Sequence, residues 1–282
     1  MEYYFSIAGA IVKIGGDKLF DDANGLENFR VSQQAWDYEI FCDLTDEMPV
    51  PEGKMVFSSP GRLVFETAEG TTSWIGPVHQ SYADAHIWVR REKNTGTALF
   101  LRRVMGEQIG IRSVLNVLEP EHLAVAQGGF LLHGSCICHE GKAIVFTAPS
   151  GTGKSTQAEL WRIHRGATVI NGDRIMLRSG QYGWEAVGVP FCGSSGIREN
   201  RILPLAAVIF LSQAPVSTVA PLTGASAFRR IWEGCTLQTW NRQDVDRCAR
   251  YVEALLGSVP VLHLACTPDI SAVEALEAVL NR

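Results

Sequence analysis

Long apolar runs, a basic amino terminus and an excess of positive charge are all missing from this sequence. No apolar run reaches the roughly 18 residues that a transmembrane helix requires, and Met1-Glu2-Tyr3-Tyr4 lacks the basic region of a signal peptide. The formal net charge is −5 at pH 7, so the chain offers no general cationic surface to nucleic acid or to an anionic membrane. The sequence therefore predicts that neither a membrane nor nucleic acid is a partner.

A disulfide framework is missing as well. The seven cysteines are an odd number, and they are scattered from Cys42 to Cys266 without regular spacing. Cys136 and Cys138 would share one face of an expected strand, but no second ligand pair at zinc-like spacing accompanies them, so buried thiols are the better interpretation. Reduced cysteines predict a cytoplasmic protein.

The first hundred residues have the pattern of a β-rich region. Polar and apolar residues alternate over 37–44, which predicts a half-buried strand. Turn signals at Glu69-Gly70 and at Asn94-Thr95-Gly96 predict two hairpins. The 282 residues suffice for two unequal domains. We therefore expect a smaller β-rich amino-terminal region, 1–106, and a larger domain, 107–282.

Helices and strands mix throughout the second half, which predicts an α/β domain. A continuous apolar run at 205–213 is typical of a fully buried strand. Thr267-Pro268 predicts the N-cap and the first position of the last helix. The other expected elements are a helical segment broken at Pro120 and ended by Gly128-Gly129, strands near 132–138, 142–147, 167–173 and 261–265, and helices near 154–164, 224–234 and 243–256.

The segment APSGTGKS, residues 148–155, fits the phosphate-binding loop (Walker A) of nucleotide-binding proteins, except that Ala148 replaces its first glycine. It lies between an apolar strand, AIVFT, and an amphipathic helix, STQAELWRIH. Glycines permit backbone N–H groups to point at phosphate oxygens, and the helix adds its amino-terminal dipole. Lys154 can reach the β- and γ-phosphates, and Ser155 offers a hydroxyl to Mg²⁺. The expected nucleotide-binding residues are Ser150, Gly151, Thr152, Gly153, Lys154, Ser155 and Thr156.

A carboxylate ligand for Mg²⁺ is expected at the end of a strand beside such a loop. Asp173 follows the loop's helix by one short strand, and we assign it to the metal together with Ser155. The alternative is an ordinary turn aspartate in Asn171-Gly172-Asp173. ATP and Mg²⁺ are thus the expected cofactors.

The block LLHGSCICHEGKAIVFTAPSGTGKSTQAELWRIHRGATVINGDRIML, and with it residues 130–215, resembles the catalytic domain of the HPr kinase/phosphorylase family. The later segment VPFCGSSGIRENRILPLAAVIFLSQ is similar to the family's shorter relatives, which include kinases that modify peptide natural products. The resemblance implies a P-loop fold related to ATP-dependent phosphoenolpyruvate carboxykinase and ATP-dependent phosphorylation of a serine hydroxyl. It does not extend to residues 1–105.

The resemblance also implies roles for single residues. His133, before Gly134, is similar to the family's active-site histidine. INGDR falls where the family has two adjacent aspartates that handle the substrate proton and Mg²⁺, but Gly172 replaces the first. The single remaining carboxylate argues against the reverse reaction, phosphorolysis of phosphoserine. Either Asp173 serves both roles or His133 takes the proton, and Lys154 completes the catalytic set.

Two questions stay open from the sequence. The segment CGSSG at 192–196 is either a loop that closes over the acceptor, with Ser194 and Ser195 at the substrate and Arg201 at the transferred phosphoryl group, or a surface loop with solvated cations. The function is either a kinase for a protein or peptide serine, docked by strand addition to the β-rich region, or a small-molecule kinase, or a nucleotide-binding regulatory protein. A homo-oligomer is compatible with each.

Overall fold

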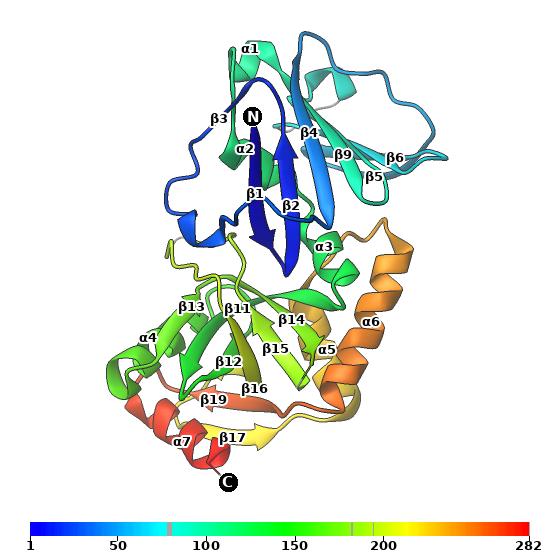
Figure 1. Cartoon of the computed structure of the whole chain (residues 1–282). Coiled ribbons are helices and arrows are strands. Elements are labelled where there is room, and N and C mark those ends of the chain that lie inside the picture. The colour runs from blue at the N-terminus through cyan, green and yellow to red at the C-terminus, as the bar shows by residue number, and fades with distance from the viewer. Residues whose placement is uncertain (78–80, 182, 194, 282) are drawn as a thin grey trace. The chain divides into compact units, whose positions relative to one another are not determined.

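The chain forms two compact units, which are described separately. A computed structural model describes every residue except 78–80, 182, 194 and 282 (Figure 1). The first unit is Met1–Glu119 and the second is Pro120–Arg282. Residues 107–119 therefore belong to the first unit, and not to the second as the sequence pattern suggested.

The first unit is built on one eight-stranded sheet, in the order β1-β2-β4-β9-β8-β7-β6-β5. Its strands are β1 (Glu2–Ile7), β2 (Ala10–Gly15), β4 (Tyr38–Thr45), β5 (Lys54–Ser59), β6 (Arg62–Glu66), β7 (Thr71–Ile75), β8 (Ile87–Arg91) and β9 (Thr95–Leu101). The strand expected near 37–44 and both expected hairpins, β6–β7 and β8–β9, are confirmed. The sequence pattern missed the hairpin of β1 and β2, where Ala8 and Gly9 take left-handed angles (φ 50° and 78°).

Buried contacts explain why the first unit extends to Glu119. Its short elements are β3 (Leu19–Phe20), η1 (Glu27–Phe29), η2 (Tyr82–Asp84), α1 (Arg102–Met105), β10 (Ile109–Gly110) and α2 (Ile111–Val117). Strand β10 pairs in parallel with β3, which ties the end of the unit to its beginning. Glu119, only 4% exposed, accepts a hydrogen bond from the guanidinium of Arg62 (2.8 Å) and forms an ion pair with that of Arg91 (2.7 Å). These long-range contacts leave no local signal in the sequence.

The second unit mixes helices and strands, as the sequence pattern predicted. Its elements are α3 (Pro120–Ala126), β11 (Gly129–His139), β12 (Lys142–Thr147), α4 (Lys154–Arg165), β13 (Thr168–Asn171), β14 (Arg174–Gly180), β15 (Gly183–Val187), β16 (Ile202–Gln213), β17 (Thr218–Pro221), α5 (Gly224–Gly234), β18 (Cys235–Thr236), α6 (Arg242–Leu256), β19 (Val261–Cys266) and α7 (Ile270–Leu280). Every expected helix and strand is present. Strands β14, β15, β17 and β18 are additional.

Two long strands of the second unit, β11 and β16, each pair with different strands along their first and second halves. The first half of β11 pairs with β14, and its second half pairs with β12. Strand β16 pairs in the same divided way, with β15 and then with β12 and β19. Strands β12, β16 and β19 are parallel, so their carboxyl ends lie at one edge of the sheet. That edge is where ligands bind in open α/β sheets.

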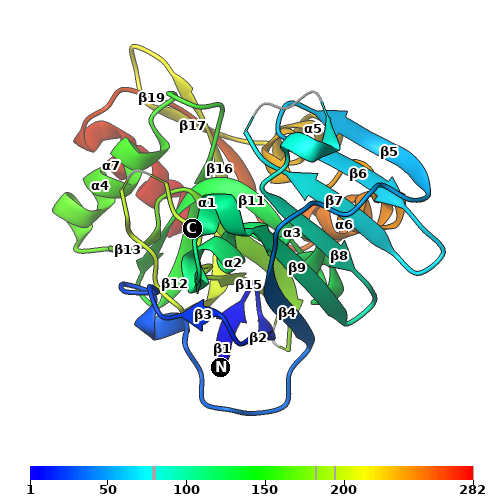
Figure 2. The ribbon, with the colours of Figure 1, turned by 90° about the horizontal axis from the view of Figure 1, so that it is seen from above.

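Apolar side chains cover both faces of the part of the sheet formed by β12, β16 and β19. Helices α4 and α7, which lie side by side (Figures 1 and 2), bury Trp161, Phe146 and Leu264 in one cluster. Helices α5 and α6 close a second cluster around Val145 and Val208. The run 205–213, expected to be a fully buried strand, lies in β16; its residues 207–211 are buried, whereas Gln213 is exposed.

The last helix begins later than its expected cap. The N-cap of α7 is Asp269, whose carboxylate accepts from the N–H of Ser271 at 2.9 Å, so the expectation of Thr267 at the N-cap is wrong. The Thr267 hydroxyl instead lies 3.1 Å from the hydroxyls of Ser217 and Ser271. Since a carboxylate at a helix N-terminus also interacts with the helix dipole, Asp269 is the stronger cap.

Two observations concern membrane-spanning helices and thiols. Within the described part of the chain, no helix is both long enough and apolar enough to cross a membrane. All seven cysteines carry free thiols.

Candidate functional site

The glycine-rich loop connects β12 to α4 at the carboxyl edge of the sheet. Gly151 (φ 79°) and Gly153 (φ 119°) have left-handed angles, and a Cβ atom at either would meet no neighbour. Backbone conformation, not crowding, therefore requires these glycines. Gly153 is the N-cap of α4, and no described side chain caps the helix or places an acid in its first turn. Such an uncapped terminus favours an anion.

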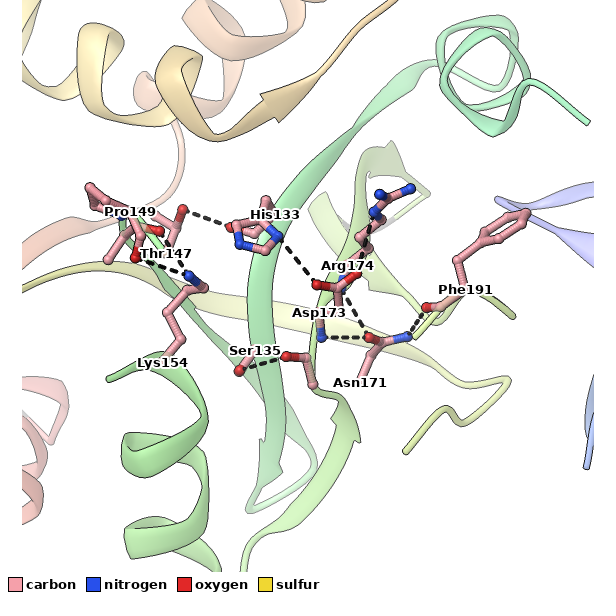
Figure 3. Close-up of polar contacts among 11 residues, drawn as sticks. His133, Ser135, Thr147, Pro149, Lys154, Asn171, Asp173, Arg174 and Phe191 are labelled. Carbon is pink, nitrogen blue, oxygen red and sulfur yellow. Dashed lines mark hydrogen bonds and ion pairs between the residues drawn. The ribbon is translucent and has the colours of Figure 1, made fainter. Parts of the chain in front are cut away.

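Lys154 is the first residue of α4 and is only 8% exposed. Its ammonium donates to the carbonyl oxygens of Ala148 (2.9 Å) and Pro149 (3.2 Å), which curl around it (Figure 3). Burial lowers the pKa of Lys154, and the nearby carboxylate of Asp173 opposes that shift. A cation stripped of most of its water is a strong partner for an incoming anion.

Asn171 holds the turn that presents Asp173. Its side-chain oxygen accepts from the backbone N–H groups of Asp173 (2.9 Å) and Arg174 (3.0 Å), and its amide donates to the carbonyls of Val189 (3.1 Å) and Phe191 (2.9 Å) (Figure 3). Asn171 is fully buried. Sequence reasoning missed this positioning residue; the asparagine of the Asn-Gly-Asp turn was the available signal.

Strand β11 joins the turn to the end of β12. Gly134 N–H donates to the Asp173 carbonyl (2.9 Å), and Ser135 Oγ donates to the Gly172 carbonyl (3.1 Å). On the other side, Thr147 Oγ1 donates to the His133 carbonyl (2.9 Å). The backbone around His133 is thereby fixed between the glycine-rich loop and the Asp173 turn.

His133 and Arg174 flank the Asp173 carboxylate. His133 Nδ1 lies 3.5 Å from Asp173 Oδ1, and Arg174 Nε lies 3.4 Å from Asp173 Oδ2 (Figure 3). Burial and the Lys154 charge lower the pKa of His133, although Asp173 acts in the opposite direction. This lowered pKa favours the neutral imidazole, the form that can accept a proton.

His133, Lys154 and Asp173 border one cavity of about 340 Å³, a volume within the range of small-molecule sites. Its lining consists of His133, Ser150, Gly151, Gly153, Lys154, Ser155, Thr156, Gly172, Asp173, Gly193 and Ser195. Thr152 stays within the loop, where its N–H donates to the Pro149 carbonyl. Arg201 is not brought to the cavity: its guanidinium lies 3.7 Å from Cys138 Sγ, toward the far end of β11. Ser194 lies outside the described residues.

The segment after β15 packs directly on the Asp173 turn. A Cβ atom at Gly172 would lie 2.4 Å from Ser195 Oγ, and a Cβ atom at Gly193 would lie 3.2 Å from Asp173 Oδ1. The Ser195 hydroxyl thus occupies the space that a side chain at residue 172 would need. A side chain at residue 172 would therefore require the Ser195 side chain to move.

Replacing Gly172 by aspartate is expected to destabilise the protein by about 1–3 kcal/mol, because the new side chain would overlap Ser195 Oγ. Urea denaturation measures the change. The double variant Gly172→Asp/Ser195→Gly should recover part of the loss. Equal losses in both backgrounds would contradict the steric explanation.

The pKa of His133, followed by NMR of its imidazole, is expected below the ordinary value near 6.5. Lys154→Met should raise this pKa, because it removes a positive charge, and Asp173→Asn should lower it further. Activity that depends on neutral His133 would then fall only as the pH drops through this lowered pKa. An unchanged or lower pKa in Lys154→Met would refute the assigned cause.

The described architecture is that of a mixed α/β protein with several sheets. Residues 104–253, more than half of the chain, match the family described as "ScmC: SynChlorMet cassette protein ScmC", and the chain belongs to this family. The matched segment includes the whole cavity lining.

Two further comparisons give little beyond this. The structure of the Hpr(Ser) kinase/phosphatase from Coxiella burnetii is similar with 11% sequence identity and a TM-score of 0.30, over 54% of this chain and 88% of that chain. A similarity this low identifies neither an activity nor a substrate. No match to a curated protein is found.

Proposed function

We propose that this protein is an ATP- and Mg²⁺-dependent kinase that transfers the γ-phosphoryl group to a serine hydroxyl of a protein or peptide. One observation carries the proposal: the buried ammonium of Lys154, the Ser155 hydroxyl and the Asp173 carboxylate border a single cavity at the amino end of α4. A buried cation, a magnesium-binding hydroxyl and a carboxylate are the set that phosphoryl transfer needs.

The residues of the glycine-rich loop are suited to a nucleoside triphosphate. Gly151 and Gly153 have left-handed backbone angles and carry no side chains. A Cβ atom at either position would meet no neighbouring atom, so the loop backbone is open to a phosphate group. Backbone N–H groups of the first turn of α4 and the Lys154 ammonium would hold the phosphate oxygens. Thr156 adds a second hydroxyl to the same lining.

The residues also fit a magnesium ion. Asp173 and Ser155 supply oxygen ligands, the type that Mg²⁺ prefers. Among the described residues no cluster of three or more His, Cys, Asp or Glu side chains forms a self-sufficient metal site. That composition suits an ion held by one carboxylate, one hydroxyl, phosphate oxygens and water.

When bound, MgATP supplies the phosphoryl group and neutralises part of its charge. In transfer, a bond forms between the acceptor oxygen and the γ-phosphorus, and the bond from that phosphorus to the β-phosphate oxygen breaks, releasing ADP. Lys154 stabilises the negative charge of the phosphates. The acceptor proton passes to Asp173 or to neutral His133. His133 Nδ1 lies 3.5 Å from Asp173 Oδ1.

Two features of the first unit support a protein or peptide acceptor. Its eight-stranded sheet ends in edge strands β1 and β5, and β5 exposes Met55 at 54%. A cavity of about 450 Å³ in the same unit is lined by Val50, Trp74 and Trp88 among others. An unpaired strand edge and a cavity lined by aromatic side chains are each suited to an extended peptide.

A nucleotide-binding regulatory protein is the second candidate. Gly172 favours it, because the space for a second carboxylate is filled by Ser195 Oγ. Such a protein should bind MgATP and show no lysine-dependent transfer.

The test uses γ-labelled ATP, Mg²⁺ and host-cell extract with the purified protein, and Lys154→Met as the control. Label in a protein or peptide fraction, absent with the variant, is the expected result. Label confined to small molecules other than free phosphate would indicate a metabolite kinase. Nucleotide binding without any lysine-dependent transfer would support the regulatory protein.

A further inference from the structure

Ser195 is a hydroxyl inside the cavity that the proposed function does not yet use. It lies in the segment between β15 and β16 and lines the cavity together with Lys154 and Asp173. Its side chain approaches the Gly172 backbone so closely that a Cβ atom there would be 2.4 Å from Ser195 Oγ. The hydroxyl therefore lies next to the carboxylate-bearing turn.

The segment that carries Ser195 is tied to this turn at both ends. Before it, the carbonyls of Val189 and Phe191 accept from the Asn171 amide. After it, Arg198 forms a β-bridge with Asn171, and Glu199 N–H donates to the Ile170 carbonyl at 2.8 Å. Both flanking stretches therefore contact β13, the strand that leads into Asp173.

One cavity contains a hydroxyl, a phosphate-binding loop and a carboxylate. These are the groups that a phosphoryl-acceptor site requires. Holding reactants together in this way greatly raises their effective concentration. Gly193, two residues before Ser195, is so close to Asp173 that a Cβ atom there would lie 3.2 Å from Oδ1. The carboxylate is thereby placed against the same segment as the hydroxyl.

We propose that Ser195 is an intramolecular phosphoryl acceptor, so that the protein phosphorylates itself at this residue; the inference rests on the kinase function proposed above. Ser195 Oγ forms a bond to the γ-phosphorus of a magnesium–nucleoside triphosphate. The bond from that phosphorus to the β-phosphate oxygen breaks, the diphosphate leaves, and the hydroxyl proton passes to the Asp173 carboxylate.

The modification has a consequence for the site itself. A phosphoserine carries a charge of about −1.5 to −2 at pH 7. At residue 195 this charge would lie in the cavity that the nucleotide phosphates occupy and beside Asp173. The phosphorylated protein should therefore bind nucleotide more weakly than the unmodified protein.

The test is incubation of the purified full-length protein with MgATP and no other protein, followed by mass-spectrometric mapping of phosphate. We expect phosphate on Ser195, at a rate per chain that does not depend on protein concentration. It should be absent from Lys154→Met and from Ser195→Ala. It should persist in the matched variant Ser179→Ala, which changes an exposed serine of β14 outside the cavity. Ser195→Thr, which keeps a hydroxyl, should carry the phosphate as phosphothreonine.

Calorimetric titration with ADP, run in parallel, separates the two hypotheses. If ADP binds and phosphate is absent from Ser195, or appears only at other residues, self-phosphorylation is overturned and the kinase proposal stands. A rate that rises with protein concentration would overturn the intramolecular step. If ADP does not bind and no phosphate is transferred to any acceptor, the proposed function itself fails. Weaker ADP binding by the protein phosphorylated at Ser195 than by the unmodified protein would support the location of the new charge.

Discussion

Lys154→Met is expected to lower phosphoryl transfer by at least about 10²-fold and to weaken ATP binding, because it removes a buried cation from the cavity lining. Methionine retains most of the side-chain volume, so the packing at the start of α4 should survive. The fold should survive too, since the ammonium donates to two carbonyl groups of its own loop, those of Ala148 and Pro149. Transfer of label from γ-labelled ATP and calorimetric titration with ATP measure the two effects.

The matched control for this prediction is Lys142→Met, which removes an exposed lysine at the start of β12. It should leave transfer, ATP binding and thermal stability close to those of the unaltered protein. Full transfer activity in Lys154→Met, with normal ATP binding, would refute the assignment of the glycine-rich loop to phosphate. A large loss of thermal stability in Lys154→Met would show that the lysine has a structural role.

Asp173→Asn is expected to cost about 10²–10⁴-fold in turnover and to raise the Mg²⁺ concentration needed for half-maximal activity. The amide is almost the same size as the carboxylate, so the turn held by Asn171 should be retained. It has no negative charge for Mg²⁺ and cannot accept the substrate proton as a carboxylate does. Initial rates over a series of Mg²⁺ concentrations give both quantities.

Asp246→Asn serves as the matched control, because it makes the same change at an exposed position of α6. Its Mg²⁺ dependence and turnover should not change. Unchanged Mg²⁺ dependence in Asp173→Asn would remove this residue from the metal site. A loss of turnover with unchanged Mg²⁺ dependence would leave Asp173 as the proton acceptor alone.

Local signals were sufficient for much of the second unit. The glycine-rich loop was placed correctly between β12 and α4 because its glycines, the apolar strand before it and the amphipathic helix after it are contiguous in sequence. The end of α4 was also readable, since Gly166 takes the left-handed angle (φ 64°) of a helix C-cap. Such features depend on neighbours within a few residues.

Contacts between distant residues were not readable in the same way. A position of Arg201 at the transferred phosphoryl group was one of two alternatives, but its guanidinium lies 3.7 Å from Cys138 Sγ. The role of Asn171 depends on Val189 and Phe191, which lie well beyond it in the chain. A sequence pattern does not reveal such partners, because the pairing of distant strands decides which residues meet.

The sequence by itself determined the mixed α/β class of the second unit, two hairpins of the first, and the position of Lys154 at the start of a helix after a glycine-rich loop. The tertiary structure alone decided that the first unit ends at Glu119, since buried ion pairs with Arg62 and Arg91 hold that residue there. It alone decided that Ser195 fills the space beside Gly172. The reason is physical: periodicity and turn chemistry act over a few residues, whereas close packing and buried charge pairs join residues from any part of the chain.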